Sequence, residues 1–145
     1  MNYWLLCCDP EGYRLGERLR DPDPRITWRV TRYHDDIAAG DLAFVWLTGG
    51  RRGICAVLHV ISSAEVVDHL EPDDVDCVDV EIGPVYALET AVVGRGFFLS
   101  ANSLRAHTAL AEMSIFSDAQ HATEYHLSRP EALKILELLA IEASD

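Results

Sequence analysis

Residues 40–60 read GDLAFVWLTGGRRGICAVLHV. The aromatic residues Phe44 and Trp46 are two positions apart, so they share one face of a strand, because successive side chains along a strand point to opposite faces. The glycine-rich GGRRG that follows supplies the positive φ angles needed to reverse the chain. The stretch therefore predicts a β-hairpin with strands at Leu42–Leu47 and Gly53–Ser62.

The tryptophan near the end of the first of these strands is unusual. Trp46 lies just before a glycine-arginine turn, whereas bulky aromatic side chains normally stay inside a protein, so the pattern indicates a pocket wall. The preceding segment TWRVTRY, residues 27–33, adds a second tryptophan, Trp28, with arginines close by. A core position remains open for both tryptophans, and Trp4 is expected in the core because it lies within an apolar strand.

Outside the hairpin, the chain alternates short apolar runs with turn residues. Ser128 followed by Glu131 predicts a capping box at the start of a closing helix. We expect that helix to bury the stripe Leu133, Ile135, Leu136, Leu139 and Ala140. Further strands are expected at Tyr3–Cys8, Val75–Ile82, Val85–Val93 and Thr123–Leu127, and helices at Tyr13–Leu19, Ser100–Ala111 and Pro130–Glu142.

This order of elements predicts an α+β fold with a curled, mostly antiparallel sheet that closes into a small β-barrel, short peripheral helices and a C-terminal helix. The 145 residues suffice for one domain, residues 1–145, which would bury roughly 70% of its unfolded surface. The apolar runs fall far short of the roughly 20 residues of a membrane span, and no targeting segment is evident. We therefore expect a cytoplasmic protein without a membrane partner.

Charge is distributed unevenly along the chain. The net charge is −12, yet residues 1–55 hold eight arginines against eight acids. The remainder holds four basic residues against sixteen acids, eight of them between Glu65 and Glu81. That acidic stretch is typical of a solvated loop and strand edge, and it would repel phosphate. Nucleic-acid binders are usually basic, and only the first third of this chain carries enough positive charge to contact phosphate.

Cysteine and histidine spacing gives no support for a metal site or a cofactor. Cys7 and Cys8 are adjacent, so on a strand they point to opposite faces, and the six histidines form no HxH or HxxxH pair. We expect Cys7, Cys8, Cys55 and Cys77 to be small, buried, reduced thiols.

Taken in order, these motifs resemble the EVE domains, a family of the PUA-like superfamily that also contains the YTH and ASCH domains. The resemblance covers most of the chain and is looser after residue 80. It rests on Tyr3-Trp4, Thr27-Trp28-Arg29 with Arg32, Gly40-Asp41, Phe44, Trp46, Gly49-Gly50, Gly53-Ile54, Ala56, Gly83-Pro84, residues 104–110 and Leu127-Ser128.

The resemblance implies a non-catalytic reader of nucleic acid that takes one modified or flipped base, in DNA or RNA, into an aromatic pocket. Stacking of a base on an aromatic ring contributes roughly 1–3 kcal/mol. The resemblance assigns the two walls to Trp28 and Trp46. Hydrogen bonds to the base edge would come from Asp9 and from the backbone at Thr48 and Gly49. Phosphates would be contacted by Arg29, Arg32, Arg51 and Arg52.

Two alternatives stay open. ASCH relatives imply an enzyme acting on RNA or nucleosides, although no GxSxG motif or triad is evident. The acidic surface could instead bind a protein partner, with the pocket holding a small ligand. The acidity favours a weak, pocket-driven reader whose affinity depends little on salt, and an exposed strand edge would allow a homodimer.

Overall fold

A computed structural model describes residues 1–10, 14–76, 84–117 and 123–144. Its elements follow the order β1 (Tyr3–Cys8), α1 (Leu15–Arg20), β2 (Arg25–Val30), β3 (Leu42–Leu47), β4 (Gly53–Val60), β5 (Glu65–Val67), β6 (Val85–Gly94), β7 (Leu99–Ser100), α2 (Ala101–Arg105), α3 (Ser114–Ser117), β8 (Glu124–Leu127) and α4 (Arg129–Ser144).

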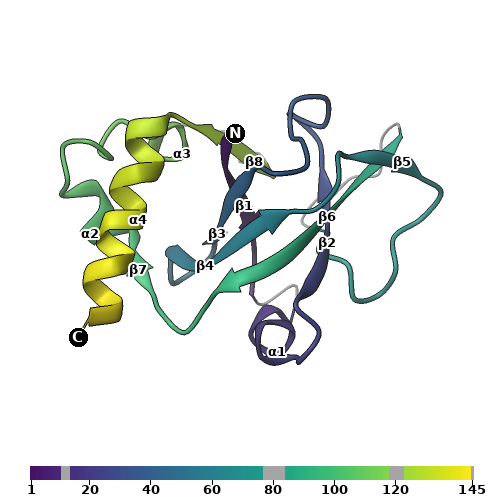
Figure 1. The fold of residues 1–145 in the computed structure, drawn as a ribbon, viewed down its shortest axis with the longest axis horizontal. Coiled ribbons are helices and arrows are strands. Elements are labelled where there is room, and N and C mark those ends of the chain that lie inside the picture. The colour runs from purple at the N-terminus through teal and green to yellow at the C-terminus, as the bar shows by residue number, and fades with distance from the viewer. Residues whose placement is uncertain (11–13, 77–83, 118–122, 145) are drawn as a thin grey trace.

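One curled sheet organises the molecule (Figure 1). Its main path runs β2-β6-β4-β3-β1-β8, with β5 paired to β6 and β7 paired to β4. The β1–β3 pair is parallel, and the other strand pairs of the described residues are antiparallel. The predicted α+β fold with a mostly antiparallel curled sheet is therefore confirmed.

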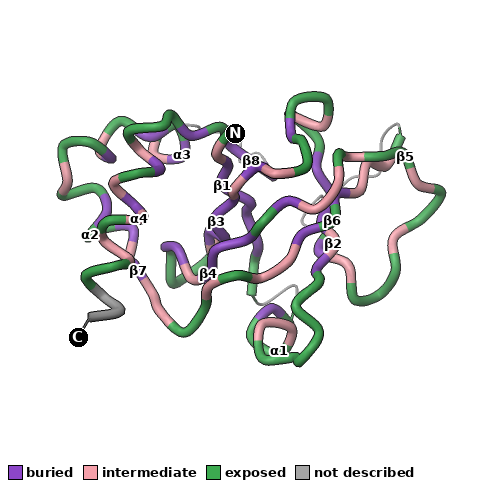
Figure 2. Tube along the Cα trace, viewed as in Figure 1, coloured by how far each residue is buried: buried purple, intermediate pink, exposed green. Residues whose placement is uncertain are grey.

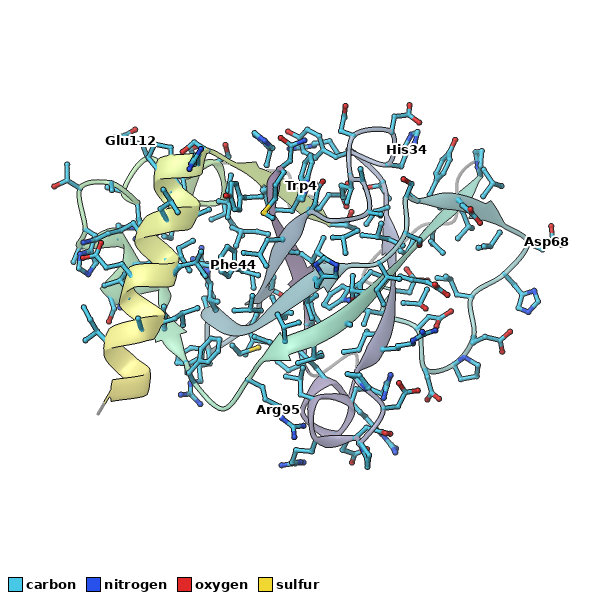
Figure 3. The ribbon with its side chains drawn as sticks, viewed as in Figure 1. Trp4, His34, Phe44, Asp68, Arg95 and Glu112 are labelled. Carbon is cyan, nitrogen blue, oxygen red and sulfur yellow. The ribbon has the colours of Figure 1, made fainter. Side chains whose placement is uncertain are left out.

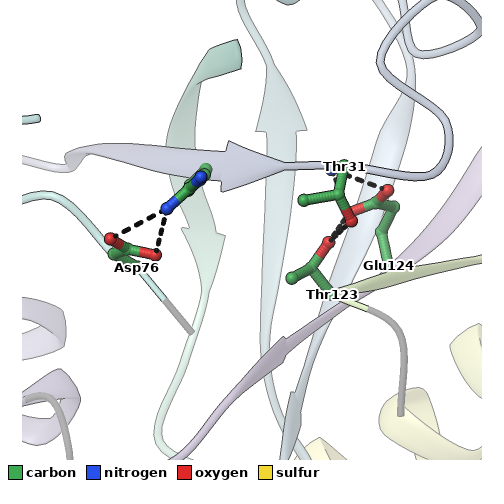
Figure 4. A network of polar contacts seen from close by, with 5 residues as sticks. Thr31, Asp76, Thr123 and Glu124 are labelled. Carbon is green, nitrogen blue, oxygen red and sulfur yellow. Dashed lines mark hydrogen bonds and ion pairs between the residues drawn. The ribbon is translucent and has the colours of Figure 1, made fainter. Parts of the chain in front are cut away.

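The curl brings the two ends of the sheet together. The carboxylate of Glu124, at the start of β8, accepts hydrogen bonds from the backbone N–H groups of Thr31 and Tyr33, just beyond β2, at 3.1 and 2.9 Å. The hydroxyls of Thr31 and Thr123 lie 2.8 Å apart (Figure 4). Side chains thus join the end strands at a place where the main path has no backbone ladder.

Side chains fill the two faces of the sheet with two separate cores. The concave face holds the cluster that contains Trp4 and Trp28, and the opposite face holds Phe44 and Trp46 under the helices. Figure 1 shows α2, α3 and α4 gathered on one side of the sheet, and Phe44 lies between the sheet and α4 in Figure 3. Buried residues follow the central strands in Figure 2, whereas α1 is mostly exposed. Both faces of the central strands are therefore buried, which explains why their sequences are almost continuously apolar.

The hairpin matches its prediction closely. Its first strand is β3, with the predicted bounds Leu42–Leu47, and its second, β4, ends at Val60, two residues earlier than expected. Gly49 has φ +90° in the connecting turn. A register shift between Val45 and Trp46 interrupts the pairing just before that turn.

The closing helix forms with the predicted capping box. The Ser128 hydroxyl accepts from the Glu131 backbone N–H at 3.2 Å, and the Glu131 carboxylate accepts from the Ser128 N–H at 2.8 Å. The predicted stripe is partly wrong, because Leu133 is 47% exposed and Ala140 is also exposed. Ala132 and Ile135 are the fully buried positions, so the buried face is shifted from the predicted one.

Several predicted elements are shorter than expected or lie partly outside the described residues. The helix expected at Ser100–Ala111 is α2 alone, capped by the Ser100 hydroxyl, and turns follow it. The strand expected at Thr123–Leu127 begins one residue later, at Glu124. The first residue of the helix expected at Tyr13–Leu19 and most of the strand expected at Val75–Ile82 fall outside the described residues, although Val75 forms a parallel bridge with Trp28.

Candidate functional site

The three tryptophans are all buried, with 1–2% of their surface exposed. Trp4 donates its ring N–H to the Asp41 carboxylate at 2.9 Å, which confirms its expected place in the core. Trp28 donates to the Thr90 hydroxyl at 3.1 Å, and Thr90 in turn donates to the Ile26 carbonyl at 2.7 Å. Both polar ring atoms are therefore satisfied inside the protein, as buried tryptophans usually require.

Trp28 and Trp46 do not face each other. Trp28 points into the concave core, whereas Trp46 points to the opposite face and packs edge-on against Phe116, with ring centroids 5.8 Å apart. The predicted aromatic pocket with these two walls is therefore not formed. The physical reason is strand alternation, which turns neighbouring positions to opposite faces; two tryptophans on different strands share a face only if the register places them there.

Three of the predicted site residues do lie together at the carboxyl ends of the parallel strands β1 and β3. The Thr48 N–H donates to the Cys8 carbonyl at 3.0 Å, which continues the β1–β3 pairing one residue past the end of β3. A Cβ on Gly49 would lie 3.7 Å from the Asp9 carboxylate, so these two residues are direct neighbours. Asp9 and Gly49 are exposed. This edge offers a carboxylate acceptor beside an open glycine backbone.

The turn after Gly49 adds exposed arginines to this edge. Arg51 lies over the ring of Phe98, with its guanidinium carbon 3.9 Å from the ring centroid. Arg52 lies 6.0 Å from the centroid of Trp46. Trp46 thus contributes as the buried support of an arginine, a role that the sequence did not suggest.

Arg29 and Arg32 lie elsewhere. Arg29 is 4% exposed, and its guanidinium contacts the Asp76 carboxylate at 3.4 Å (Figure 4). That burial contradicts its predicted contact with phosphate. Arg32 is exposed and lies 5.7 Å from the ring centroid of Tyr125. It follows β2 and adjoins β8, so it is separate from the turn that carries Arg51.

Two buried carboxylates were missed by sequence reasoning. Asp41 is 4% exposed and accepts hydrogen bonds from the Asn2 and Ala38 backbones as well as from Trp4. Glu124 is fully buried and holds the backbone that follows β2. In the sequence, the Gly40-Asp41 pair contributes only to the family resemblance, and the signal for a buried carboxylate is its place directly before an apolar strand. The hydrogen bonds that Asp41 and Glu124 accept inside the protein indicate structural roles for both carboxylates.

A hollow of about 400 Å³ lies beside α1, lined by Leu19, Asp21, Pro22, Pro24, Val92, Val93, Gly94 and Arg95. None of the predicted site residues lines it. Arg95 reaches toward α1 and donates to the Leu19 carbonyl (Figure 3).

The described residues contain no group of three or more metal-binding side chains and no helix long and apolar enough to cross a membrane. Cys7 and Cys8 are buried, and burial raises the pKa of the Cys55 thiol to about 11. The predicted burial is confirmed for Cys7 and Cys8, whereas Cys55 is only partly buried, and Cys77 lies outside the described residues.

Comparison with solved structures places this architecture among known folds. A hypothetical protein from Leishmania major superposes with a TM-score of 0.76, at 17% identity, over 99% of this chain and 97% of that one. Human THYN1, solved in complex with DNA containing 5-methylcytosine, gives a TM-score of 0.71 at 18% identity, over 95% and 97% of the two chains. The protein shares the fold of these two structures.

The DUF55 domain of human thymocyte nuclear protein 1 agrees with this assignment, with a TM-score of 0.70 at 17% identity over 94% of this chain and 97% of that domain. No protein-family model matches the sequence, and no curated protein matches it either. The shared fold is therefore recognised through its three-dimensional arrangement, at 17–18% identity to these three neighbours.

Proposed function

We propose that this protein is a non-catalytic nucleic-acid-binding domain that recognises a modified base, with 5-methylcytosine in DNA as the first ligand to test. The observation that carries the proposal is the fold shared, over 95% of the chain, with a human domain solved on DNA containing that base. A shared fold alone does not determine function, so a nucleic-acid-binding protein also needs a suitable surface.

The edge formed by Asp9, Thr48 and Gly49 is the surface we assign to the base. A carboxylate accepts hydrogen bonds from an exocyclic amino group such as that of cytosine. The glycine backbone at this edge has no side chain to keep a base away. The neighbouring turn carries Arg51 and Arg52, which suit phosphate.

The burial of the tryptophans changes the form of the proposed pocket. Because Trp28 is hydrogen-bonded in the concave core, a base stacked between Trp28 and Trp46 is excluded in this conformation. We assign the recognition of the base edge to Asp9 and the exposed turn, and we assign Trp46 a supporting role beneath Arg52.

The test is a binding panel with labelled oligonucleotides of one sequence. It compares duplex DNA with cytosine, 5-methylcytosine or 5-hydroxymethylcytosine at one position, and the corresponding RNA, by fluorescence anisotropy. We expect tighter binding to one modified form, and loss of that preference in Asp9→Asn with the fold retained. Equal affinity for every member of the panel would overturn the proposal.

A further inference from the structure

We infer that the phosphodiester backbone of the bound nucleic acid runs from the β3–β4 turn across β7 to the end of α2, over three arginines that are held on aromatic rings. This inference rests on the proposed function, and it adds Arg105, which the resemblance did not assign.

The three arginines share an arrangement. Arg51 lies 3.9 Å from the ring centroid of Phe98, Arg105 lies 4.5 Å from that of Phe116, and Arg52 lies 6.0 Å from that of Trp46. All three are exposed. Within the described part of the chain, none of these three arginines forms an ion pair, although other basic side chains do. Their charge is therefore available to an outside anion.

Ring contacts connect two of the arginines, and chain adjacency connects the third. Trp46 and Phe116 are in edge contact, with centroids 5.8 Å apart, so Arg52 and Arg105 lie over adjoining rings. Phe98 lies against Gly53, where β7 pairs with the start of β4. Arg51 and Arg52 are neighbours in the chain. Arg52 and Arg105 thus lie over adjoining rings of the helix-side core, and Arg51 lies next to Arg52 in the chain, over the ring that packs beside β7.

Charge complementarity identifies the occupant as a polyanion. A protein with net charge −12 repels phosphate over most of its surface, so uncompensated arginines provide a local region where a nucleic-acid strand can approach. A guanidinium stacked on a ring keeps its N–H edge directed outward and loses less side-chain entropy on binding than a free arginine. The rings therefore orient these arginines for phosphate before binding.

A charge-removal series tests the path. The probe is a fluorescein-labelled DNA duplex with one 5-methylcytosine, titrated at several salt concentrations with wild type, Arg52→Gln, Arg105→Gln and the double variant. Arg129→Gln is the matched control, because Arg129 is exposed and follows β8, whose end pairs with the start of β1, away from the β3–β4 turn. Thermal melting verifies that each variant is folded.

Each lost phosphate contact should reduce the slope of log K against log salt concentration by about 0.9 for duplex DNA. We expect Arg105→Gln and Arg52→Gln each to reduce the slope by about this amount, the double variant by about twice as much, and Arg129→Gln to leave it unchanged. The preference for 5-methylcytosine over cytosine should survive in all of them, since phosphate contacts carry no base information.

Two conservative variants separate the effect of holding an arginine on a ring from the effect of its charge. Phe98→Leu retains every arginine, so the salt slope should stay at its wild-type value while affinity falls, because Arg51 is no longer held on a ring. Arg105→Lys should retain the slope that Arg105→Gln loses.

Failure of the phosphate path and failure of the proposed function give different results. If Arg52→Gln and Arg105→Gln titrate like Arg129→Gln while the wild type still prefers the modified duplex, the phosphate path is wrong and the proposed function stands. A wild type that binds neither the modified nor the unmodified duplex overturns both.

Discussion

Glu124 is a fully buried carboxylate whose partners are backbone N–H groups rather than a basic side chain. It binds successive amides of Thr31, Arg32 and Tyr33, and it also accepts from the Thr123 hydroxyl. Consecutive N–H groups that converge on one anion form a local positive site. A single side chain thereby joins β8 to the segment that follows β2.

Replacing Glu124 by glutamine should therefore destabilise the protein. The amide lacks the negative charge and places an N–H₂ group among donors, so we expect the free energy of unfolding to fall by about 2 kcal/mol, within the range for hydrogen bonds to charged groups. Urea denaturation measures this change.

Glu137→Gln is the control for that measurement. Its carboxylate is 60% exposed and contacts Lys134 at 3.4 Å, and surface pairs of this kind contribute at most about 1 kcal/mol. If the two variants lose equal stability, Glu124 does not have the role assigned to it.

Cys55 gives a second prediction at this scale. Burial raises the pKa of its thiol from 9.0 to about 11, so at pH 8 the reactive thiolate should be about 100-fold scarcer than in the unfolded chain. Alkylation of the Cys55 peptide, followed by mass spectrometry, should be slower in the native protein by at least that factor. Similar rates in native and denatured protein would contradict the assigned burial.

The raised pKa of Cys55 also determines whether stability rises or falls at alkaline pH. Between pH 9 and pH 11 the unfolded chain loses the Cys55 proton first, so folding becomes less favourable as pH rises through this window. Comparison of the wild type with Cys55→Ala should show that this part of the alkaline destabilisation disappears in the variant.

At the scale of elements, Gly53 decides how β7 pairs with β4. A Cβ at this position would lie 2.2 Å from the Leu99 carbonyl oxygen and 2.8 Å from the Phe98 ring. The backbone oxygen cannot move without disturbing the β4–β7 ladder, so Gly53→Ala should lower the free energy of unfolding by about 2–3 kcal/mol.

Gly50 is the matched control in the same turn. A Cβ there would meet nothing within 4 Å, so Gly50→Ala should change stability by no more than about 0.5 kcal/mol. Chemical denaturation of the two variants side by side tests the claim, and equal effects would show that the close approach of β7 is unimportant.

Some of these elements could be predicted from the sequence, and others could not. The hairpin, the first strand and the capping box were predictable because alternation, glycine turns and capping are local rules. The buried face of α4 was predicted only in part, because several of its positions are apolar and the packing against the sheet decides which of them are covered.

The site was predictable only in part, for a related reason. Asp9, Thr48 and Gly49 come together because the ends of two strands that pair in parallel lie side by side. Trp28 and Trp46 were placed in one pocket by resemblance, yet they face opposite sides of the sheet, which depends on how β2 and β3 sit within the whole curl. The stacking of Arg105 on Phe116 has no local sequence signal.

At the scale of the whole molecule, the charge distribution limits how the protein can bind a polyanion. With net charge −12, contacts to phosphate have to be few and local, and three stacked arginines would give a salt slope of about −2.7 on duplex DNA. Proteins with six to ten phosphate contacts have slopes two to three times steeper. Under the proposed function, specificity is therefore expected to come mainly from the base.

The most direct test of modified-base recognition is a pair of anisotropy titrations with two duplexes that differ in a single methyl group. One duplex carries cytosine and the other 5-methylcytosine at the same position. Burial of one methyl group contributes about 0.8 kcal/mol, so the account predicts that the methylated duplex binds about fourfold more tightly or better. Equal dissociation constants for the two duplexes, or no binding to either, would contradict it.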